Sequence, residues 1–178
     1  VDTASHSGEE NPMGLIPMAE LGGSVLIEFF VTLQSLSVHS TWQARHGSLL
    51  GLQALLLAYD SASLRSVDLV YRLVSVLALD RFNDFNGDQV VAPVREAASQ
   101  CLGLLAKCDP LKVPILEQTL KLCKNHTIWQ VRHSGLTALK YVLPSLREFS
   151  EKIYQVAFGL LSDPDDDVKA GSALILAH

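Results

Sequence analysis

The chain has 178 residues, of which 48% are apolar and 19% charged, and this composition supports one sizeable core and excludes a disordered chain. Aromatic residues make up only 7%, which disfavours a β-sandwich, and no apolar run approaches the ~18 residues that a membrane span needs. The net charge is −5 without a run of Lys or Arg, so we expect no direct contact with nucleic acid from this segment. Three cysteines without a CxxC pair predict buried free thiols in a reducing compartment.

The first 20 residues contain two prolines and little periodicity, and we predict a flexible lead-in there. We expect residues 21–178 to form a single helical array. The chain begins at Val1 without a Met and stops at His178 inside an apolar helical pattern, which indicates a fragment of a longer protein.

Four segments align on a basic residue, and the same residue types recur around it in each. The preceding residue is Ala or Val, the third residue after it is small, and the seventh is Leu, which places these positions on one face of an α-helix. We predict structural roles for the following repeat positions: Trp42, Arg45, Leu52, Pro93, Arg95, Leu102, Trp129, Arg132, Leu139, Asp163, Lys169 and Leu176.

A second apolar-periodic stretch precedes each of these segments, at residues 25–36, 64–79, 111–122 and 146–161. Each unit is therefore predicted as a helix, a turn and a second helix, with units at about 21–59, 63–107, 110–143 and 144–178. The basic residues lie 37 to 50 positions apart, a period typical of HEAT repeats. The predicted fold class is all-α, an armadillo-like α-solenoid of about four helix pairs, and no segment predicts a strand.

Start signals agree with this arrangement. Ser40 and Thr127 are predicted to cap the second helices of the first and third units, and Pro93 to begin that of the second. Asp163 is predicted as the N-cap that opens the fourth, with Pro164 in its first turn.

The residues that could carry chemistry are more simply explained by packing. His46 and His133 occupy equivalent repeat positions, which favours packing or a hydrogen bond between helices over metal binding. The aligned Arg residues could bind an acidic partner, but their recurrence favours a ladder in which each reaches an acidic or carbonyl group of the adjacent unit. We find no phosphate loop, and we expect no catalytic residue, metal or cofactor in this segment.

The turn at residues 80–88 is longer than a connection between helices requires, and it carries two aromatic and several charged residues. Either Phe82 and Phe85 pack into the groove between units, or the turn contacts a partner. The candidate partner-binding residues are Arg81, Phe82, Asn83, Asp84, Phe85 and Asp88.

Several blocks of the sequence resemble one family. They are WQARHG at residues 42–47, ALDRFNDF at 78–85, DQVVAPVRE at 88–96, WQVRH at 129–133 and the acidic segment at 163–168. In this order they are similar to the TATA-binding-protein-associated SWI/SNF-type ATPases. The first repeat has Gly47 after the histidine where the third has Ser134, which is also small.

The resemblance implies a HEAT solenoid that grips TATA-binding protein in the nucleus, and a motor elsewhere in the parent chain that uses ATP to remove that protein from DNA. It also implies that the turns between helices face the partner. The leading hypothesis is thus a non-catalytic scaffold that binds TATA-binding protein and neighbouring HEAT repeats of its own chain. The alternatives are a HEAT adaptor of nuclear transport or chromosome organisation, and, third, an enzyme.

Overall fold

Residues 23–59, 62–80, 84–86, 89–125 and 127–178 are described by a computed structural model, and α-helices account for most of them. The predicted lead-in at residues 1–20 lies outside this range. The first helices of the four pairs are α1 (Gly23–Leu36), α3 (Val67–Leu79), α5 (Asp109–Cys123) and α7 (Ser150–Leu160). The second helices are α2 (Trp42–Ala58), α4 (Pro93–Leu105), α6 (Trp129–Val142) and α8 (Asp166–Leu176).

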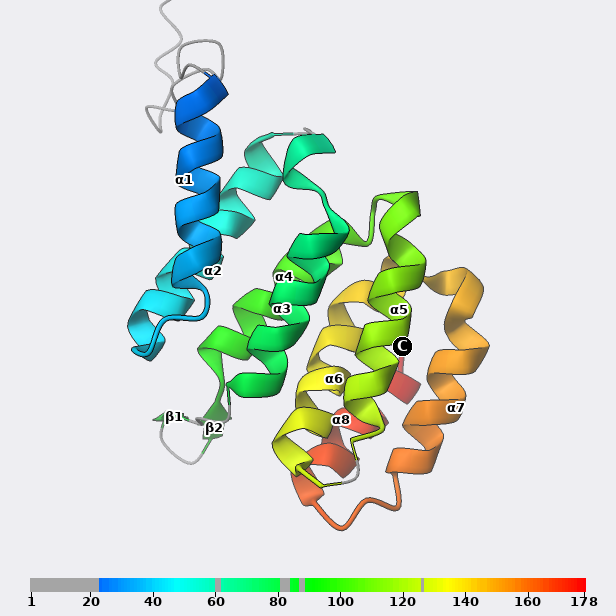
Figure 1. The fold of residues 1–178 in the computed structure, drawn as a ribbon. Coiled ribbons are helices and arrows are strands. Elements are labelled where there is room, and N and C mark those ends of the chain that lie inside the picture. The colour runs from blue at the N-terminus through cyan, green and yellow to red at the C-terminus, as the bar shows by residue number, and fades with distance from the viewer. Residues whose placement is uncertain (1–22, 60–61, 81–83, 87–88, 126) are drawn as a thin grey trace, which may run out of the picture.

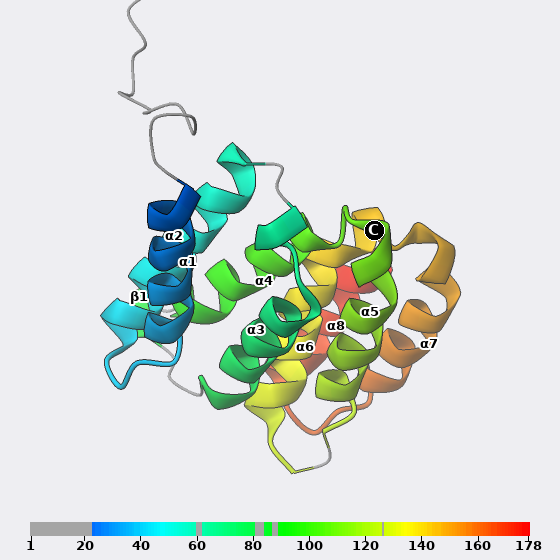
Figure 2. The ribbon, with the colours of Figure 1, turned by 45° about the horizontal axis from the view of Figure 1, so that its top comes forward.

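The helix pairs follow one another from α1 at the left of Figure 1 to α7 at the right, with the first helices of the pairs in one layer and the second helices in the other (Figures 1 and 2). In the second layer α2 packs against α4, α4 against α6 and α6 against α8. In the first layer α3 packs against α5 and, less extensively, α5 against α7. This stacking of helix pairs confirms the predicted all-α solenoid.

The predicted repeat face is the face that the second helices bury. In the column of small residues, Ser48, Ala98, Gly135 and Ser172 are all buried. The Leu column is buried at Leu52, Leu102 and Leu139, whereas Leu176 is only partly buried. The helical spacing therefore identified the correct face of each helix.

Small residues in this column let neighbouring helices approach closely. Gly135 on α6 lies so near α5 that an added Cβ would stand 2.6 Å from Cys123 Sγ and 2.7 Å from its backbone nitrogen. Gly103 on α4 is similarly close to the backbone of Tyr141, at 2.9 Å from its carbonyl oxygen. At these two positions the packing distance between helices requires glycine.

The helix starts differ from the prediction by one or two residues. Thr41 and Ile128 hold the N-cap positions of α2 and α6, in place of Ser40 and Thr127. Asp165, and not Asp163, caps α8, where its side chain accepts from the backbone N–H groups of Asp167 and Val168. Asp163 lies two residues before this cap, where its carboxylate pairs with an arginine of the neighbouring pair and also accepts from the backbone N–H of Asp165. Pro93 begins α4 as predicted.

Two of the predicted first helices are shorter than their apolar stretches. The 3-10 turn η1 (Ala62–Leu64) precedes α3, and η2 (Leu143–Ser145) and η3 (Arg147–Phe149) precede α7. Leu64 and Leu146 are buried in these connections, so the apolar pattern continues beyond the regular helix.

The long turn contains the one element that the prediction missed, a short hairpin. Strand β1 (Asp84–Asn86) pairs with β2 (Gln89–Val91) in antiparallel register, with Phe85 opposite Val90. The prediction of no strand is therefore wrong at this point. The hairpin lies below the end of α3 and the start of α4 (Figure 1). No helix within the described residues is long and apolar enough to cross a membrane.

Truncation of a Leu in the buried column tests the assignment of helix faces. Leu139 on α6 is fully buried, so we expect Leu139→Ala to lower the free energy of unfolding by about 2–5 kcal/mol. Urea denaturation measures the change. Leu57→Ala on α2, where the side chain is 65% exposed, is the matched control and should change stability little. Equal losses in the two variants would contradict the assignment.

Adding one methyl group tests the close approach of α5 and α6. Gly135→Ala should destabilise the chain by about 1–3 kcal/mol, because the new Cβ meets the Cys123 backbone. A Cβ added at Gly47 on α2 meets no atom within 4 Å. Gly47→Ala should therefore stabilise the chain by about 0.5–1 kcal/mol, the usual gain of alanine over glycine in a helix. Thermal denaturation of both variants shows whether the sign of the change follows the packing.

Candidate functional site

The ends of the helices that face each other across the turns gather at one edge of the array (Figure 1). This turn edge, as we call it, comprises the last turns of α1, α3, α5 and α7, the first turns of α2, α4, α6 and α8, and the hairpin β1–β2. Three of the connections there are short, at residues 37–41, 124–128 and 161–165, whereas residues 80–92 separate α3 from α4. The second connection is more than twice as long as the others.

Arg45 joins the turn edge of the first pair to that of the second. Its Nη2 donates to Asp80 Oδ1 at 2.7 Å, and Asp80 follows the last residue of α3. Its Nη1 donates to the backbone carbonyls of His39 and Ser40, at 2.9 and 3.0 Å. The side chains of Arg45 and Asp80 are only 11% and 3% exposed, so water screens this ion pair weakly.

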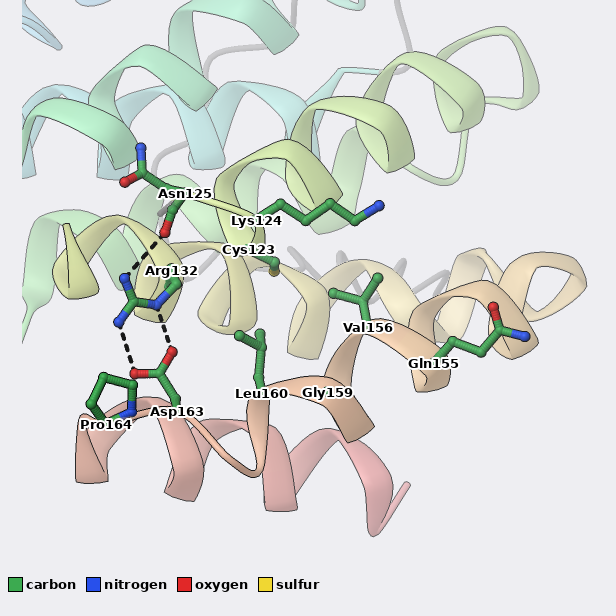
Figure 3. Close-up of a pocket in the computed structure, with 10 residues that line it drawn as sticks. All are labelled: Cys123, Lys124, Asn125, Arg132, Gln155, Val156, Gly159, Leu160, Asp163 and Pro164. Atoms are coloured by element: carbon green, nitrogen blue, oxygen red, sulfur yellow. Dashed lines mark hydrogen bonds and ion pairs between the residues drawn. The ribbon is translucent and has the colours of Figure 1, made fainter. Parts of the chain in front are cut away.

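Arg132 makes the corresponding contact between the third and fourth pairs. Its Nε and Nη2 donate to the two carboxylate oxygens of Asp163, at 2.6 and 2.8 Å, and Figure 3 shows this two-pronged contact. Its Nη1 donates to the carbonyl of Asn125 at 3.1 Å. The planar guanidinium suits this task, since it holds the turn of its own pair and the carboxylate of the next at once.

These two contacts, the rungs at Arg45 and Arg132, confirm the predicted ladder at both positions. Lys169 does not extend it in this chain, because its Nζ pairs with Asp166 of the same helix at 2.5 Å. Arg95 is 1% exposed, and its Nη1 lies 3.3 Å from Nδ1 of His133 on α6. This contact bears out the expectation that His133 forms a hydrogen bond between helices. His46 instead packs its ring against Trp42 of its own helix, at 6.2 Å between ring centroids.

The rung at Arg132 adjoins a cavity of about 550 Å³ between the end of α5 and the side of α7. Apolar groups of Val156, Gly159 and Leu160 form one wall, and Cys123 contributes to the other (Figure 3). Burial raises the pKa of the Cys123 thiol to about 12, so it stays protonated at neutral pH and is a poor nucleophile. Arg132 and Asp163 neutralise each other beside it. The cavity thus offers apolar surface and an internally satisfied ion pair.

All three cysteines are free thiols, as predicted. Cys101 and Cys123 are buried, and Cys108 is partly exposed. Burial raises the pKa of the Cys101 thiol to about 12 as well. Among the described residues, no three His, Cys, Asp or Glu side chains are grouped as metal ligands would be.

Most of the predicted partner-binding residues fall outside the described part of the chain. These are Arg81, Phe82, Asn83 and Asp88. Asp84 and Phe85 form the backbone of β1 on the turn edge. The choice between rings that pack in the groove and rings that contact a partner therefore stays open at this stage.

The sequence analysis missed the acidic partners of the ladder. Asp80 and Asp163 each follow the last helical turn of a first helix, and Asn125 holds the same place after α5. Asn125 accepts from the backbone N–H groups of Thr127 and Ile128, at 3.0 and 2.9 Å. An Asp or Asn shortly after each of these helices was the sequence pattern that could have indicated these partners. The long connection after α3 hides it, because it places Asp80 farther from the next aligned basic residue than Asn125 and Asp163 are from theirs.

A second chain of polar contacts crosses the second layer of helices. Gln53 on α2 donates to Gln100 on α4 at 3.0 Å, and Gln100 donates to the hydroxyl of Tyr141 on α6 at 3.4 Å. The Tyr141 hydroxyl also donates to Glu96, which pairs with Lys140 at 3.3 Å. These contacts and the rungs fix how successive pairs are oriented.

Comparison with known proteins gives one consistent result. The chain is 36% identical over 157 residues to human TATA-binding protein-associated factor 172, which covers 76% of the chain and 8% of that protein. It is 32% identical over 167 residues to TATA-binding protein-associated factor MOT1 of Saccharomyces cerevisiae, covering 76% of the chain and 9% of that protein. The chain belongs to the family of TATA-binding protein-associated factors. No known protein-family profile matches it.

A solved structure of this family has the same fold. The crystal structure of the Mot1 N-terminal domain in complex with TBP matches 96% of the chain, with a TM-score of 0.67 and 31% identity, and the match covers 23% of that domain. The chain spans less than a tenth of the length of the two relatives. Its likeness is therefore to part of the N-terminal, non-motor region of these factors.

Removing one carboxylate tests the rung at Arg132. The guanidinium holds the pKa of Asp163 below its usual range, and a lowered pKa in the folded state stabilises the fold above the unfolded pKa. We expect Asp163→Asn to lower the free energy of unfolding at pH 7 by about 1.5–3 kcal/mol. The difference in stability between the variant and the wild type should vanish as the pH falls through the folded pKa of Asp163, because protonation then breaks the ion pair in the wild type as well.

Urea denaturation between pH 2.5 and pH 7 measures this dependence. Asp166→Asn is the control, because Asp166 is 93% exposed and pairs with Lys169 of its own helix. It should have a small effect at every pH. A loss in Asp163→Asn that is constant across the range would argue against an ionic rung.

Proposed function

We propose that this chain is a non-catalytic HEAT scaffold that binds TATA-binding protein as part of a transcription regulator. The observation that carries the proposal is the match of 96% of the chain to the Mot1 N-terminal domain, whose structure is that of a complex with TBP. Both relatives named above are TATA-binding protein-associated factors. This favours the present function over a HEAT adaptor of nuclear transport or chromosome organisation.

The turn edge supplies the contact surface in this proposal. The rungs hold the edges of adjacent pairs in fixed relation, so groups that project from the edge are presented on a stiff support. The hairpin β1–β2 is the longest projection, and β2 leads through Ala92 directly into α4. The chain's net charge of −5 favours a partner with a basic surface.

The proposal assigns ATP hydrolysis to a motor outside this chain and places the protein in the nucleus. Two features support a binding role for the segment itself. The buried thiols Cys101 and Cys123 have pKa values of about 12, so neither is activated. The ladder arginines Arg45 and Arg132 already have carboxylate partners within the array.

The aromatic residues of the long turn give the test. We expect Phe82→Ala together with Phe85→Ala to weaken the affinity for purified TATA-binding protein at least tenfold, because each removed ring would take contact area from the interface. Isothermal titration calorimetry measures the affinity. Helix content and melting temperature should stay within error of the wild type.

Phe158→Ala is the matched control, since that ring is 71% exposed on α7, away from the hairpin. It should leave the affinity unchanged. If the double variant melts at a markedly lower temperature and binds normally per folded molecule, Phe82 and Phe85 are packing residues. If the wild-type chain does not bind TATA-binding protein at all, the proposed function itself is wrong.

A further inference from the structure

The contact between the second and third pairs includes a histidine, a residue type whose ordinary pKa lies near neutral pH. On either side of it the rungs at Arg45 and Arg132 use aspartate carboxylates, a residue type whose ordinary pKa is about 4. The hydrogen bonds from Arg132 hold the pKa of Asp163 below its usual range. Arg95 contacts the imidazole of His133 instead, with 3.3 Å between Nη1 and Nδ1. Histidine changes its charge between about pH 5 and 8.

The geometry fixes the protonation state of this histidine. Arginine can only donate hydrogen bonds, so Nδ1 of His133 must accept, and the imidazole is neutral with its proton on Nε2. Protonation would place an N–H at Nδ1 against the N–H of Arg95. It would also put two positive charges in contact at a site where Arg95 is almost fully buried.

A cavity of about 150 Å³ adjoins the Arg95–His133 pair. It is lined by Arg95 and Glu96 of α4 with the preceding Ala92, by Trp129, His133 and Thr137 of α6, and by Asp167 of α8. Ala92 caps α4 and follows β2, so this site lies at the base of the hairpin.

Opposing charges face His133 from the elements around it. Burial, and then the positive charge of Arg95, lower the pKa of His133, whereas Asp167 and Asp165 at the start of α8 and Glu96 on α4 act to raise it. Burial lowers the pKa of Arg95, and the negative charges of Asp80 at the end of α3 and of Asp167 act to raise it. The balance favours the neutral imidazole, in agreement with the hydrogen bond.

We propose that the Arg95–His133 contact is a proton-sensitive joint, at which protonation of His133 in mildly acidic solution loosens the packing of α4 on α6. The flanking rungs hold at this pH, so the array gives way between the second and third pairs first. The base of the hairpin is attached to the same joint. Acidification therefore loosens the support of the hairpin before it affects the rest of the array.

The sign of the pH dependence follows from the lowered pKa. A histidine that is harder to protonate in the folded than in the unfolded chain stabilises the fold above the unfolded pKa, and this contribution is lost as the pH falls through the folded pKa. Protonation of His133 lowers the equilibrium constant for folding. The decrease is about tenfold for each unit by which the pKa of His133 in the folded chain lies below its pKa in the unfolded chain.

The test compares melting temperatures of the chain between pH 5.0 and 8.0. On acidification the melting temperature of the wild type should fall more than that of His133→Gln. The side-chain oxygen of the glutamine can still accept from Arg95 but does not titrate. His46→Gln is the matched control, because His46 holds the equivalent repeat position on α2 and should leave the wild-type slope unchanged. If melting temperature depends on pH with the same slope in the wild type and in His133→Gln, the proposal is wrong.

Two further measurements keep the proposal falsifiable if His133→Gln folds poorly. Side-chain NMR of the wild type should show His133 titrating below 6.5, and titration at or above 6.5 would overturn the proposal. Hydrogen exchange, corrected for the intrinsic pH dependence, should show amides of the second turns of α4 and α6 losing protection at pH 5.5, while those of α2 and α8 keep it. Uniform loss along the array would also overturn it.

Discussion

The close packing of one helix pair on the next is the constraint on which the rest of this structure depends. A single pair of helices exposes an apolar face that it cannot bury by itself, so each pair is stable only against its neighbours. Ser48, Ala98, Gly135 and Ser172 keep one column small, and the Leu column fills the space beside it. Gly135 and Gly103 set the distance, since no larger residue fits there without displacing backbone. The repeat therefore constrains volume at a few positions and leaves the outer surface free to vary.

Apolar packing alone would allow pairs to rotate against one another, and the polar contacts remove much of that freedom. The guanidinium of Arg132 holds the turn carbonyl of its own pair and both oxygens of Asp163 in the next. Arg45 does the same between the first two pairs with one carboxylate oxygen of Asp80 and two carbonyls. Because these groups are largely buried, losing one partner would leave a charge without compensation.

The parts of the fold that follow from short-range periodicity could be predicted from the sequence, and the parts that depend on contacts between pairs could not. Spacings of three and four residues identified the buried face of each second helix, down to Leu52, Leu102 and Leu139. The N-caps differed from the prediction by one or two residues because residue type alone does not fix where a helix begins. Asp163, a good cap by residue type, lies two residues before the cap of α8 and pairs with Arg132 across 31 positions of sequence. The hairpin was missed since three residues per strand are too few to show alternation. The contact between Arg95 and His133 required knowing that α4 and α6 lie side by side.

The ladder also limits how such a scaffold can recognise a partner. Arg45 and Arg132 form ion pairs within the array, so these two repeat residues are not available to an acidic partner. Under the proposed function, a partner would then be contacted by groups that depart from the repeat. The hairpin is such a departure, since the turns of the other three pairs are short and alike in length. In the proposed scaffold, residues of the hairpin can therefore differ without disturbing the packing on which the array depends.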